Sequence, residues 1–305
     1  MADKVYAKAN TLTSVRETQL LGKEQWDSLL RSGSLSDARR LLRDWGYLSG
    51  DTGGSTAREI VAAKEEELFA WAGQITPVEG VLSLFTAAKD ANNLKVLFRE
   101  ELDSSGESEL WLEGGSLDRA GLCEGDCRKL LDDFSADWEQ HGSWQRINLM
   151  AEHFRLSLLK KNAELLGEPE VETFVSDIID LYNLSVFVQN SGENPLPLRL
   201  SFAEGGTIGK AEWVAAAENG DTSYPARTPY GAVWESREDF DSARDNFLME
   251  KVRAAKMMPF GLLPFLAYLF AAVMELKNLR MVITALENGL STDLVRRRLR
   301  ILYEI

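Results

Sequence analysis

The chain has 305 residues, of which 45% are hydrophobic and 27% are charged, as is typical of a globular protein large enough for two or three domains. Its formal net charge of -14 argues against broad electrostatic binding to nucleic acid or to an anionic membrane surface. Because there are two cysteines and no apolar segment at the amino terminus, we expect neither a disulfide framework nor a secretory signal, and the sequence predicts a reducing compartment, most simply the cytoplasm.

Helical signals dominate the chain from its beginning. Capping-box-like starts occur at residues 34–37, 56–59 and 236–239, and each is followed by a helical rather than an alternating pattern of apolar residues. Extended pieces are expected only at residues 109–112 and 198–202. Loops are expected at residues 50–55, 103–107, 190–197 and 219–230, where turn-forming residues gather.

A short pattern, acid-x-x-Asn-Leu, occurs three times. Its asparagines are separated by 90 and then by 95 residues, and prolines at positions 77, 169 and 264 precede the three copies, which predicts a helix start each time. This regular spacing indicates one structural unit used three times. The three copies are Asp90, Asn93 and Leu94; Asp180, Asn183 and Leu184; and Glu275, Asn278 and Leu279.

A glycine turn follows the first two copies of the motif. Residues 113–117, Glu-Gly-Gly-Ser-Leu, return as residues 204–208, Glu-Gly-Gly-Thr-Ile, whereas the third copy has a partial echo at residues 287–289. We therefore expect an all-α protein of three similar helical subdomains that arose by internal triplication. The predicted boundaries are residues 1–117, 118–208 and 209–305, with the last subdomain shortened at its end.

On a helix, the acid, the asparagine and the leucine of each motif share one face. Asparagine is unfavourable inside a helix, so hydrogen bonds to a neighbouring segment are expected to compensate for it. Two interpretations remain. Either the motif is a packing joint, in which the leucine fills the core, or three equivalent motifs surround a common centre and contact a partner there.

Residues 204–211 resemble a phosphate-binding loop, but Glu204 stands where such a loop needs glycine. Ala211 stands where it needs the hydroxyl that binds magnesium. The segment is therefore predicted to be a turn before a helix, and no cofactor is expected.

No metal or catalytic site is predicted. Cys123 and Cys127 have helical spacing, but a zinc site would need two more ligands, and the two histidines, His141 and His153, lie in other segments. With so few histidines, no nucleophile elbow and no paired carboxylates, the pattern does not favour acid-base or covalent catalysis.

Residues 257–274 contain no charged residue, and this length is at the lower limit for a membrane-spanning helix. Pro259, Gly261 and Pro264 interrupt the first half of this segment. A buried core helix or a docking surface is therefore favoured over a membrane span.

A basic cluster lies near the end of the chain, in the last predicted helix. Positive charge there suits the negative end of the helix dipole, but in a chain of net charge -14 it also reverses the local sign. Two interpretations stay open, namely docking on an acidic partner surface and ordinary dipole compensation. The cluster consists of Arg296, Arg297, Arg298 and Arg300.

Residues 90–99, the closing stretch of residues 259–290 and the middle copy around Asp180 together resemble the C subunits of the prokaryotic V-type and A-type ATP synthases, which are relatives of the d subunit of the eukaryotic vacuolar pump. The resemblance implies an all-helical funnel of three units about a pseudo-threefold axis. It also implies a non-catalytic central-stalk protein without cofactors, which links the membrane proteolipid ring to the D and F subunits of the shaft and transmits torque for ATP-coupled ion transport. Such a protein lies peripherally on the cytoplasmic side of the membrane, has no membrane span of its own and binds no nucleic acid.

The copies depart from one another around the motif. The sixth residue after the asparagine is Arg99 in the first copy, but Gln189 and Thr284 in the others, so identical polar contacts are not expected. The alternative is a helical scaffold or adaptor with no ATPase role. A period near 90 residues counts against it, because scaffold repeats usually have periods of about 20 to 50 residues.

Overall fold

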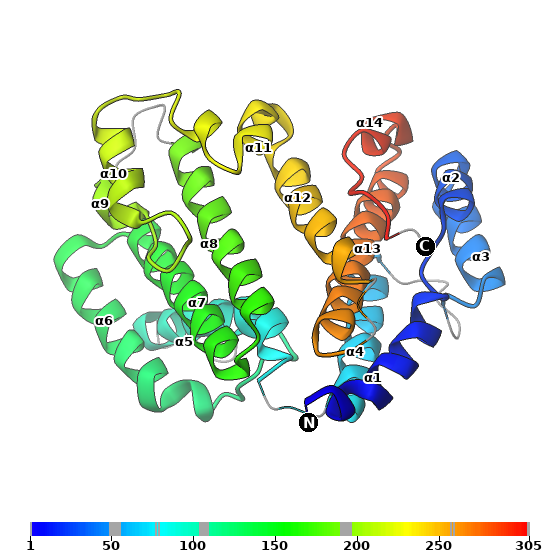
Figure 1. Ribbon diagram of the computed structural model, residues 1–305, viewed down its shortest axis with the longest axis horizontal. Helices are drawn as coiled ribbons and strands as arrows, with labels where there is room; N and C mark the ends of the chain where they lie inside the picture. The colour runs from blue at the N-terminus through cyan, green and yellow to red at the C-terminus, as the bar shows by residue number, and fades with distance from the viewer. Residues whose placement is uncertain are drawn as a thin grey trace. The chain divides into compact units, whose positions relative to one another are not determined.

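The computed structural model describes residues 2–48, 56–76, 78, 80–103, 110–189, 197–256, 258 and 260–303, and these form helices, turns and irregular segments without any strand. The predicted all-α class is confirmed (Figure 1). The α-helices are α1 (Ala2–Glu17), α2 (Lys23–Arg31), α3 (Leu35–Asp44), α4 (Ala57–Ile75), α5 (Ser83–Asp103), α6 (Gly125–His141), α7 (Trp144–Leu166), α8 (Pro169–Gln189), α9 (Leu198–Ser201), α10 (Lys210–Glu218), α11 (Gly231–Glu235), α12 (Phe240–Ala255), α13 (Leu263–Glu287) and α14 (Thr292–Arg296). Short 3-10 helices are η1 (Gly121–Cys123), η2 (Pro225–Arg227) and η3 (Arg237–Asp239).

The chain divides into two compact units. The terminal unit combines residues 1–77 with residues 236–305, and the middle unit contains residues 78–235. The first two motif copies, on α5 and α8, belong to the middle unit, whereas the third, on α13, belongs to the terminal unit. The triplication with its boundaries at residues 117 and 208 stays a prediction.

The terminal unit is built around α13. This helix packs against α1, α3, α4, α12 and α14. Its side chains are buried on almost every face from Pro264 to Ala272, so the uncharged segment is a core helix from Leu263 onward. Met257 and Pro259 of the predicted segment lie outside the described residues. Within the described ranges, no helix is long and apolar enough to cross a bilayer.

The middle unit is built on α5 and α7, which pack along each other, with α6 and α8 beside α7. Phe98 of α5 is fully buried and contacts the rings of Phe134 and Trp138 from α6 and of Trp144 from α7. Leu94, the leucine of the first motif, lies in the same core cluster. The motif therefore points its leucine inward, as predicted for a packing joint.

Most helix starts follow the local signals. Ser34 Oγ accepts a hydrogen bond from the Asp37 N–H (3.1 Å) at the start of α3, and Thr56 and Glu59 form a reciprocal capping box at the start of α4. Pro169 is the first residue of α8, and Pro264 is the second residue of α13. Pro77 lies outside the described residues, and α5 begins at Ser83.

Three local predictions were wrong. Residues 198–201 form the short helix α9 and not an extended piece, because Pro197, with φ near its preferred value at -58°, lies at the N-cap and its carbonyl accepts from the Ser201 N–H. The capping-box-like start predicted at residues 236–239 does not begin an α-helix, because Ser236 precedes the 3-10 helix η3 without a side-chain cap and α12 begins only at Phe240. Cys123 and Cys127 do not share a helical face, because the extended residue Glu124 (φ -124°, ψ 165°) separates η1 from α6.

Other expected loops fall largely beyond what the structure describes. Residues 50–55, 104–109 and 190–196 lie outside the described residues, including Glu109 of the second expected extended piece. Residues 110–112 form a turn and an irregular segment. Residues 219–230 form the expected loop, interrupted by η2.

Candidate functional site

The motif asparagines make the same pair of hydrogen bonds in all three helices. Each side-chain amide donates to the backbone carbonyl, and accepts from the backbone N–H, of one residue that lies 19 to 22 positions later in the chain. The side-chain amide therefore satisfies the backbone N–H and C=O groups that an irregular segment would otherwise leave unpaired. These hydrogen bonds hold the segment against the helix. The pairs are Asn93 with Leu112 (2.8 and 2.9 Å), Asn183 with Ala203 (3.1 and 2.8 Å), and Asn278 with Arg300 (3.1 and 2.9 Å).

The acid of the second motif is surrounded by hydrogen-bond donors. Asp180 is fully buried and accepts from the backbone N–H groups of Thr207 (2.8 Å) and Ile208 (3.2 Å). The Tyr230 hydroxyl also donates to it (3.0 Å). Burial raises the pKa of Asp180, while these donors act in the opposite direction. Asp180 thus holds the Glu-Gly-Gly-Thr-Ile turn against α8.

The glycine pair in this turn has a steric reason. Gly205 has a φ of +99°, in the left-handed region, and a Cβ atom on Gly206 would overlap the Asp180 carboxylate. The first copy repeats this arrangement, because a Cβ atom on Gly115 would overlap Asp90. There, Asp90 accepts from the N–H groups of Ser116 (3.2 Å) and Leu117 (3.3 Å). The turn predicted to precede a helix within residues 204–211 is confirmed, because α10 begins at Lys210, and the backbone N–H groups of this turn donate hydrogen bonds to the motif acid.

The acid of the third motif has a different partner. Glu275 accepts a hydrogen bond from the backbone N–H of Leu21 (2.6 Å), a residue 254 positions earlier in the chain. Leu21 lies in the α1–α2 segment, residues 18–22, which joins α1 to α2. Because a full Gly-Gly turn does not follow α13, the longer glutamate side chain instead reaches a segment from the other end of the sequence.

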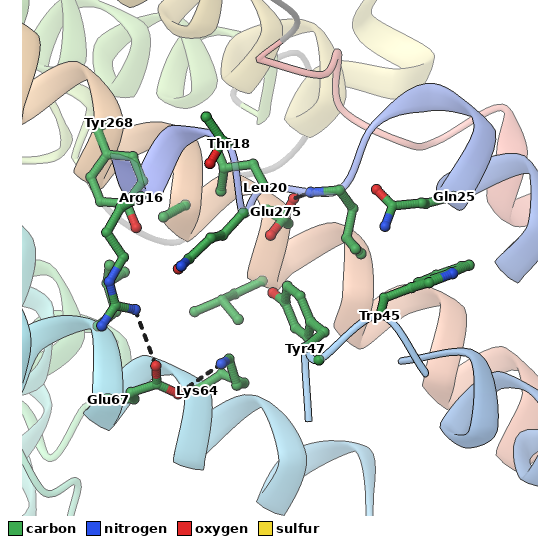
Figure 2. Close-up of a pocket in the computed structure, with 16 residues that line it drawn as sticks. Arg16, Thr18, Leu20, Gln25, Trp45, Tyr47, Lys64, Glu67, Tyr268 and Glu275 are labelled. Atoms are coloured by element: carbon green, nitrogen blue, oxygen red, sulfur yellow. Dashed lines mark hydrogen bonds and ion pairs between the residues drawn. The ribbon is translucent and has the colours of Figure 1, made fainter. Parts of the chain in front are cut away.

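Next to Glu275 lies a cavity of about 490 Å³ in the terminal unit, shown in Figure 2. In this cavity, Glu67 of α4 forms ion pairs with the Lys64 ammonium (2.7 Å) and with the Arg16 guanidinium (3.1 Å). Aromatic rings cover both cations, since Arg16 lies 5.0 Å from the Trp71 ring and Lys64 lies 4.9 Å from the Tyr47 ring. Further lining comes from Thr18, Gln25, Trp45 and Tyr268.

The electrostatics of this cavity centre on Glu275. Burial raises its pKa to about 7, although the Leu21 N–H, the Tyr47 hydroxyl and the Lys64 ammonium favour the ionised form. Burial and the nearby Glu275 raise the pKa of Tyr47. At the rim, the hydrogen bond from Lys64 contributes most to lowering the pKa of Glu67. The cavity thus borders a buried carboxyl group whose ionised form is disfavoured by burial.

A second buried acid in the terminal unit organises the end of the chain. Asp245 of α12 accepts from Arg300 Nε (3.0 Å) and Lys277 Nζ (3.1 Å), and Arg244 also pairs with it (3.1 Å). Burial by itself would raise the pKa of Asp245, but these three cations outweigh it and the pKa is lowered. The Arg300 side chain is 12% exposed, so it forms an ion pair inside the unit and is not part of the surface cluster.

The predicted arginine cluster is therefore divided. The α14 helix ends at Arg296, so the prediction that the cluster fills the last helix was wrong, because the Arg300 backbone pairs with Asn278 in place of a helical partner. Arg296 pairs with Asp27 (2.8 Å), Arg298 lies 3.7 Å from Asp239, and Arg297 is exposed. The docking role predicted for these side chains stays a prediction.

Sequence reasoning missed the cavity, Tyr230 and Asp245. The change from aspartate to glutamate in the third motif, together with the missing Gly-Gly turn, is the sequence signal that distinguishes Glu275. In the part of the chain that the structure describes, no group of three or more potential metal ligands comes together. Cys123 is exposed and Cys127 is buried.

Comparisons with known proteins match almost the whole chain. The model of the ATP synthase (C/AC39) subunit family matches residues 9–298. The chain is 22% identical to the C subunit of the V-type sodium ATPase of Enterococcus hirae, over 98% of this chain and 99% of that protein. It is also 22% identical to the C subunit of the A-type ATP synthase of Methanocaldococcus jannaschii, over 95% of this chain and 85% of that protein.

Proposed function

The chain belongs to the ATP synthase (C/AC39) subunit family, and on that basis we propose that it is the central-stalk subunit of a V/A-type rotary ATPase. In this role it binds the membrane proteolipid ring on one side and the D and F subunits of the shaft on the other. It works peripherally on the cytoplasmic side of the membrane, carries out no chemistry on ATP itself, and transmits torque for ATP-coupled ion transport.

The observation that carries the proposal is the end-to-end match. The alignment with the Enterococcus hirae protein covers nearly all of both chains, so the similarity is not confined to one helix or one repeat. All three copies of the acid-x-x-Asn-Leu motif lie within the matched residues 9–298.

The internal construction of both units suits the transmission of force. Each motif helix fixes an irregular segment by two amide hydrogen bonds, and a buried acid fixes a second segment. Segments held by several buried hydrogen bonds resist displacement, because breaking them leaves unsatisfied polar groups. Joints of this kind support a protein that passes rotation between neighbours without deforming.

Co-elution with each partner tests the proposal. The purified chain is mixed at micromolar concentration with the D and F subunits of the same organism, and separately with the detergent-solubilised ring. We expect a stable complex on size-exclusion chromatography in each case. Elution of the chain alone in both experiments would overturn the rotor role and favour the helical scaffold or adaptor.

The exposed arginines offer a finer test of the docking surface. Replacement of Arg296, Arg297 and Arg298 by alanine is expected to weaken binding to an acidic partner surface at least tenfold at low salt, and less at high salt, because exposed charges are screened. The matched control replaces three other exposed cations, Arg40, Arg58 and Lys161. Equal losses of affinity in both triple variants would indicate non-specific charge attraction and would contradict the proposal that these arginines form a docking surface.

A further inference from the structure

We propose that Glu275 and Lys64 form a proton-controlled latch between α13, α4 and the α1–α2 segment. With its proton bound, Glu275 is neutral and accepts the Leu21 N–H of the α1–α2 segment, while Lys64 stays on Glu67 at the rim of the cavity. Loss of the proton draws Lys64 from Glu67 to Glu275 and changes how α4 and the α1–α2 segment are held. The latch is a property of the chain itself and does not depend on the proposed rotor function.

The position of Glu275 supports one half of the latch. Glu275 is 9% exposed as a residue and lines two cavities, the large one of about 490 Å³ and a smaller one of about 20 Å³ that has room for about one water molecule. Neutral residues face it from α2 and α12, namely Gln25 and Met249. The charged and titratable groups around these cavities are Arg16 from α1, Tyr47 after α3, Lys64 and Glu67 from α4, Tyr268 from α13 and Tyr303 near the end of the chain.

The position of Lys64 supports the other half. Lys64 and Glu275 line the same cavity, and the Lys64 ammonium now binds Glu67, whose side chain is 45% exposed (Figure 2). An ion pair with such an exposed carboxylate is weak. The Arg16 guanidinium remains on Glu67 at 3.1 Å, so Glu67 keeps a partner when Lys64 leaves. The flexible lysine side chain lies in a cavity with space for this movement.

The driving force comes from burial. An ionised carboxylate inside a protein is unfavourable unless a cation pairs with it, whereas Glu67 is already half in water and already paired with Arg16. When Glu275 loses its proton, the exchange of Lys64 from Glu67 to Glu275 therefore lowers the free energy. While Glu275 is protonated, the same exchange does not lower the free energy, so Lys64 stays on Glu67 at the rim.

The direction of the pH dependence follows from the raised pKa of Glu275. Its pKa is about 7 in the folded chain against an ordinary 4.5, so the stability it contributes is fully present below pH 4.5 and is lost as the pH rises through about 7. The latch therefore weakens the terminal unit between mildly acidic and mildly alkaline solution.

Urea unfolding of the full chain from pH 5 to pH 8 tests the latch, together with hydrogen exchange of the α1–α2 segment corrected for intrinsic rates. In the wild type, we expect the unfolding equilibrium constant to rise about 100-fold over this range, and the hydrogen exchange of the segment to change with a midpoint near pH 7. Glu275→Gln should abolish both changes. The control Glu66→Gln, at an exposed position on the same helix as Lys64, should behave as the wild type.

Two further variants separate a latch from a merely buried acid. Lys64→Met removes the incoming cation and should raise the midpoint by about one pH unit, whereas Glu67→Gln releases Lys64 and should lower it by about as much. These shifts are measurable even if Glu275→Gln fails to fold. The same midpoint in Lys64→Met, Glu67→Gln and the wild type would overturn the proposal, as would an unchanged pH profile in a folded Glu275→Gln.

Discussion

The motif acids of the two units differ in what surrounds them. In the middle unit, Asp180 accepts from Thr207, Ile208 and Tyr230, and the glycine turn fits closely against it. In the terminal unit, Glu275 accepts from Leu21 and borders a cavity. The comparison teaches that one sequence pattern produces a rigid joint where the next segment brings donors to the acid, and a titratable group where that segment is missing.

Replacement of Asp180 by asparagine should give the largest effect in the comparison. The new NH2 group would face N–H and O–H donors, so at least one of them would lose its acceptor, and we expect a loss of about 3 kcal/mol in the free energy of unfolding. The corresponding change, Glu275→Gln, should stabilise the chain at pH 8, because it removes a buried charge. Urea unfolding of both variants checks this difference. Destabilisation of both by the same amount at pH 8 would break the comparison.

The shared part of the motif should be costly to remove in either unit. Asn93→Ala removes both hydrogen bonds to Leu112 and leaves its backbone groups without their partner, so we expect a loss of about 2 kcal/mol. The adjacent Asn92 makes one exposed hydrogen bond, to Leu110, and Asn92→Ala should cost less than about 1 kcal/mol. Urea unfolding monitored by circular dichroism distinguishes the two. Equal losses would show that the amide pairing is not what stabilises the segment.

The close approach of the glycine turn can be tested without touching the acid. Gly206→Ala places a methyl group against the Asp180 carboxylate, and the resulting displacement should cost about 1 to 3 kcal/mol. Gly33→Ala is the control, because a Cβ atom there meets no atom within 4 Å. Thermal unfolding of both variants provides the measurement. If Gly206→Ala is as stable as Gly33→Ala, the turn can move away from Asp180 at little cost, and the close packing of the turn against this acid would be contradicted.

The smallest effect is expected at the surface of the terminal unit. Arg296 and Asp27 form an ion pair in which the side chains are 49% and 33% exposed, so Arg296→Ala should cost less than about 1 kcal/mol. Unfolding at low and high salt measures this, and the difference should shrink as salt is added. A larger loss that does not depend on salt would mean that Arg296 supports the fold in a way that the ion pair does not explain.

Much of the architecture followed from local signals. The starts of α3 and α4 were predicted from Ser34 and Thr56, and the start of α8 from Pro169, because capping and proline geometry depend on a few adjacent residues. The start of α12 was misplaced, since Ser236 led into a 3-10 turn. The need of the motif asparagines for tertiary partners was also predicted, since their low helix propensity is a property of the residue.

The candidate site was less accessible to prediction. Nothing near Glu275 in the sequence points to Leu21, Tyr47 or Lys64, because these residues meet it only after α13 has been enclosed by the first helices of the chain. The division of the arginine cluster was equally hidden. Arg300 turns inward to Asp245, a partner 55 positions away, while Arg297 stays exposed, although the two are similar in sequence context.

The sequence by itself determined that the chain is helical and that three of its helices carry acid-x-x-Asn-Leu, because helix periodicity, capping and proline restriction act over a few residues. Only the tertiary structure decided which segment each acid reaches, and therefore which acid is enclosed by donors and which borders a cavity. The physical reason is that burial and hydrogen bonding depend on every element that surrounds a side chain. For Glu275, one of those elements lies 254 residues away.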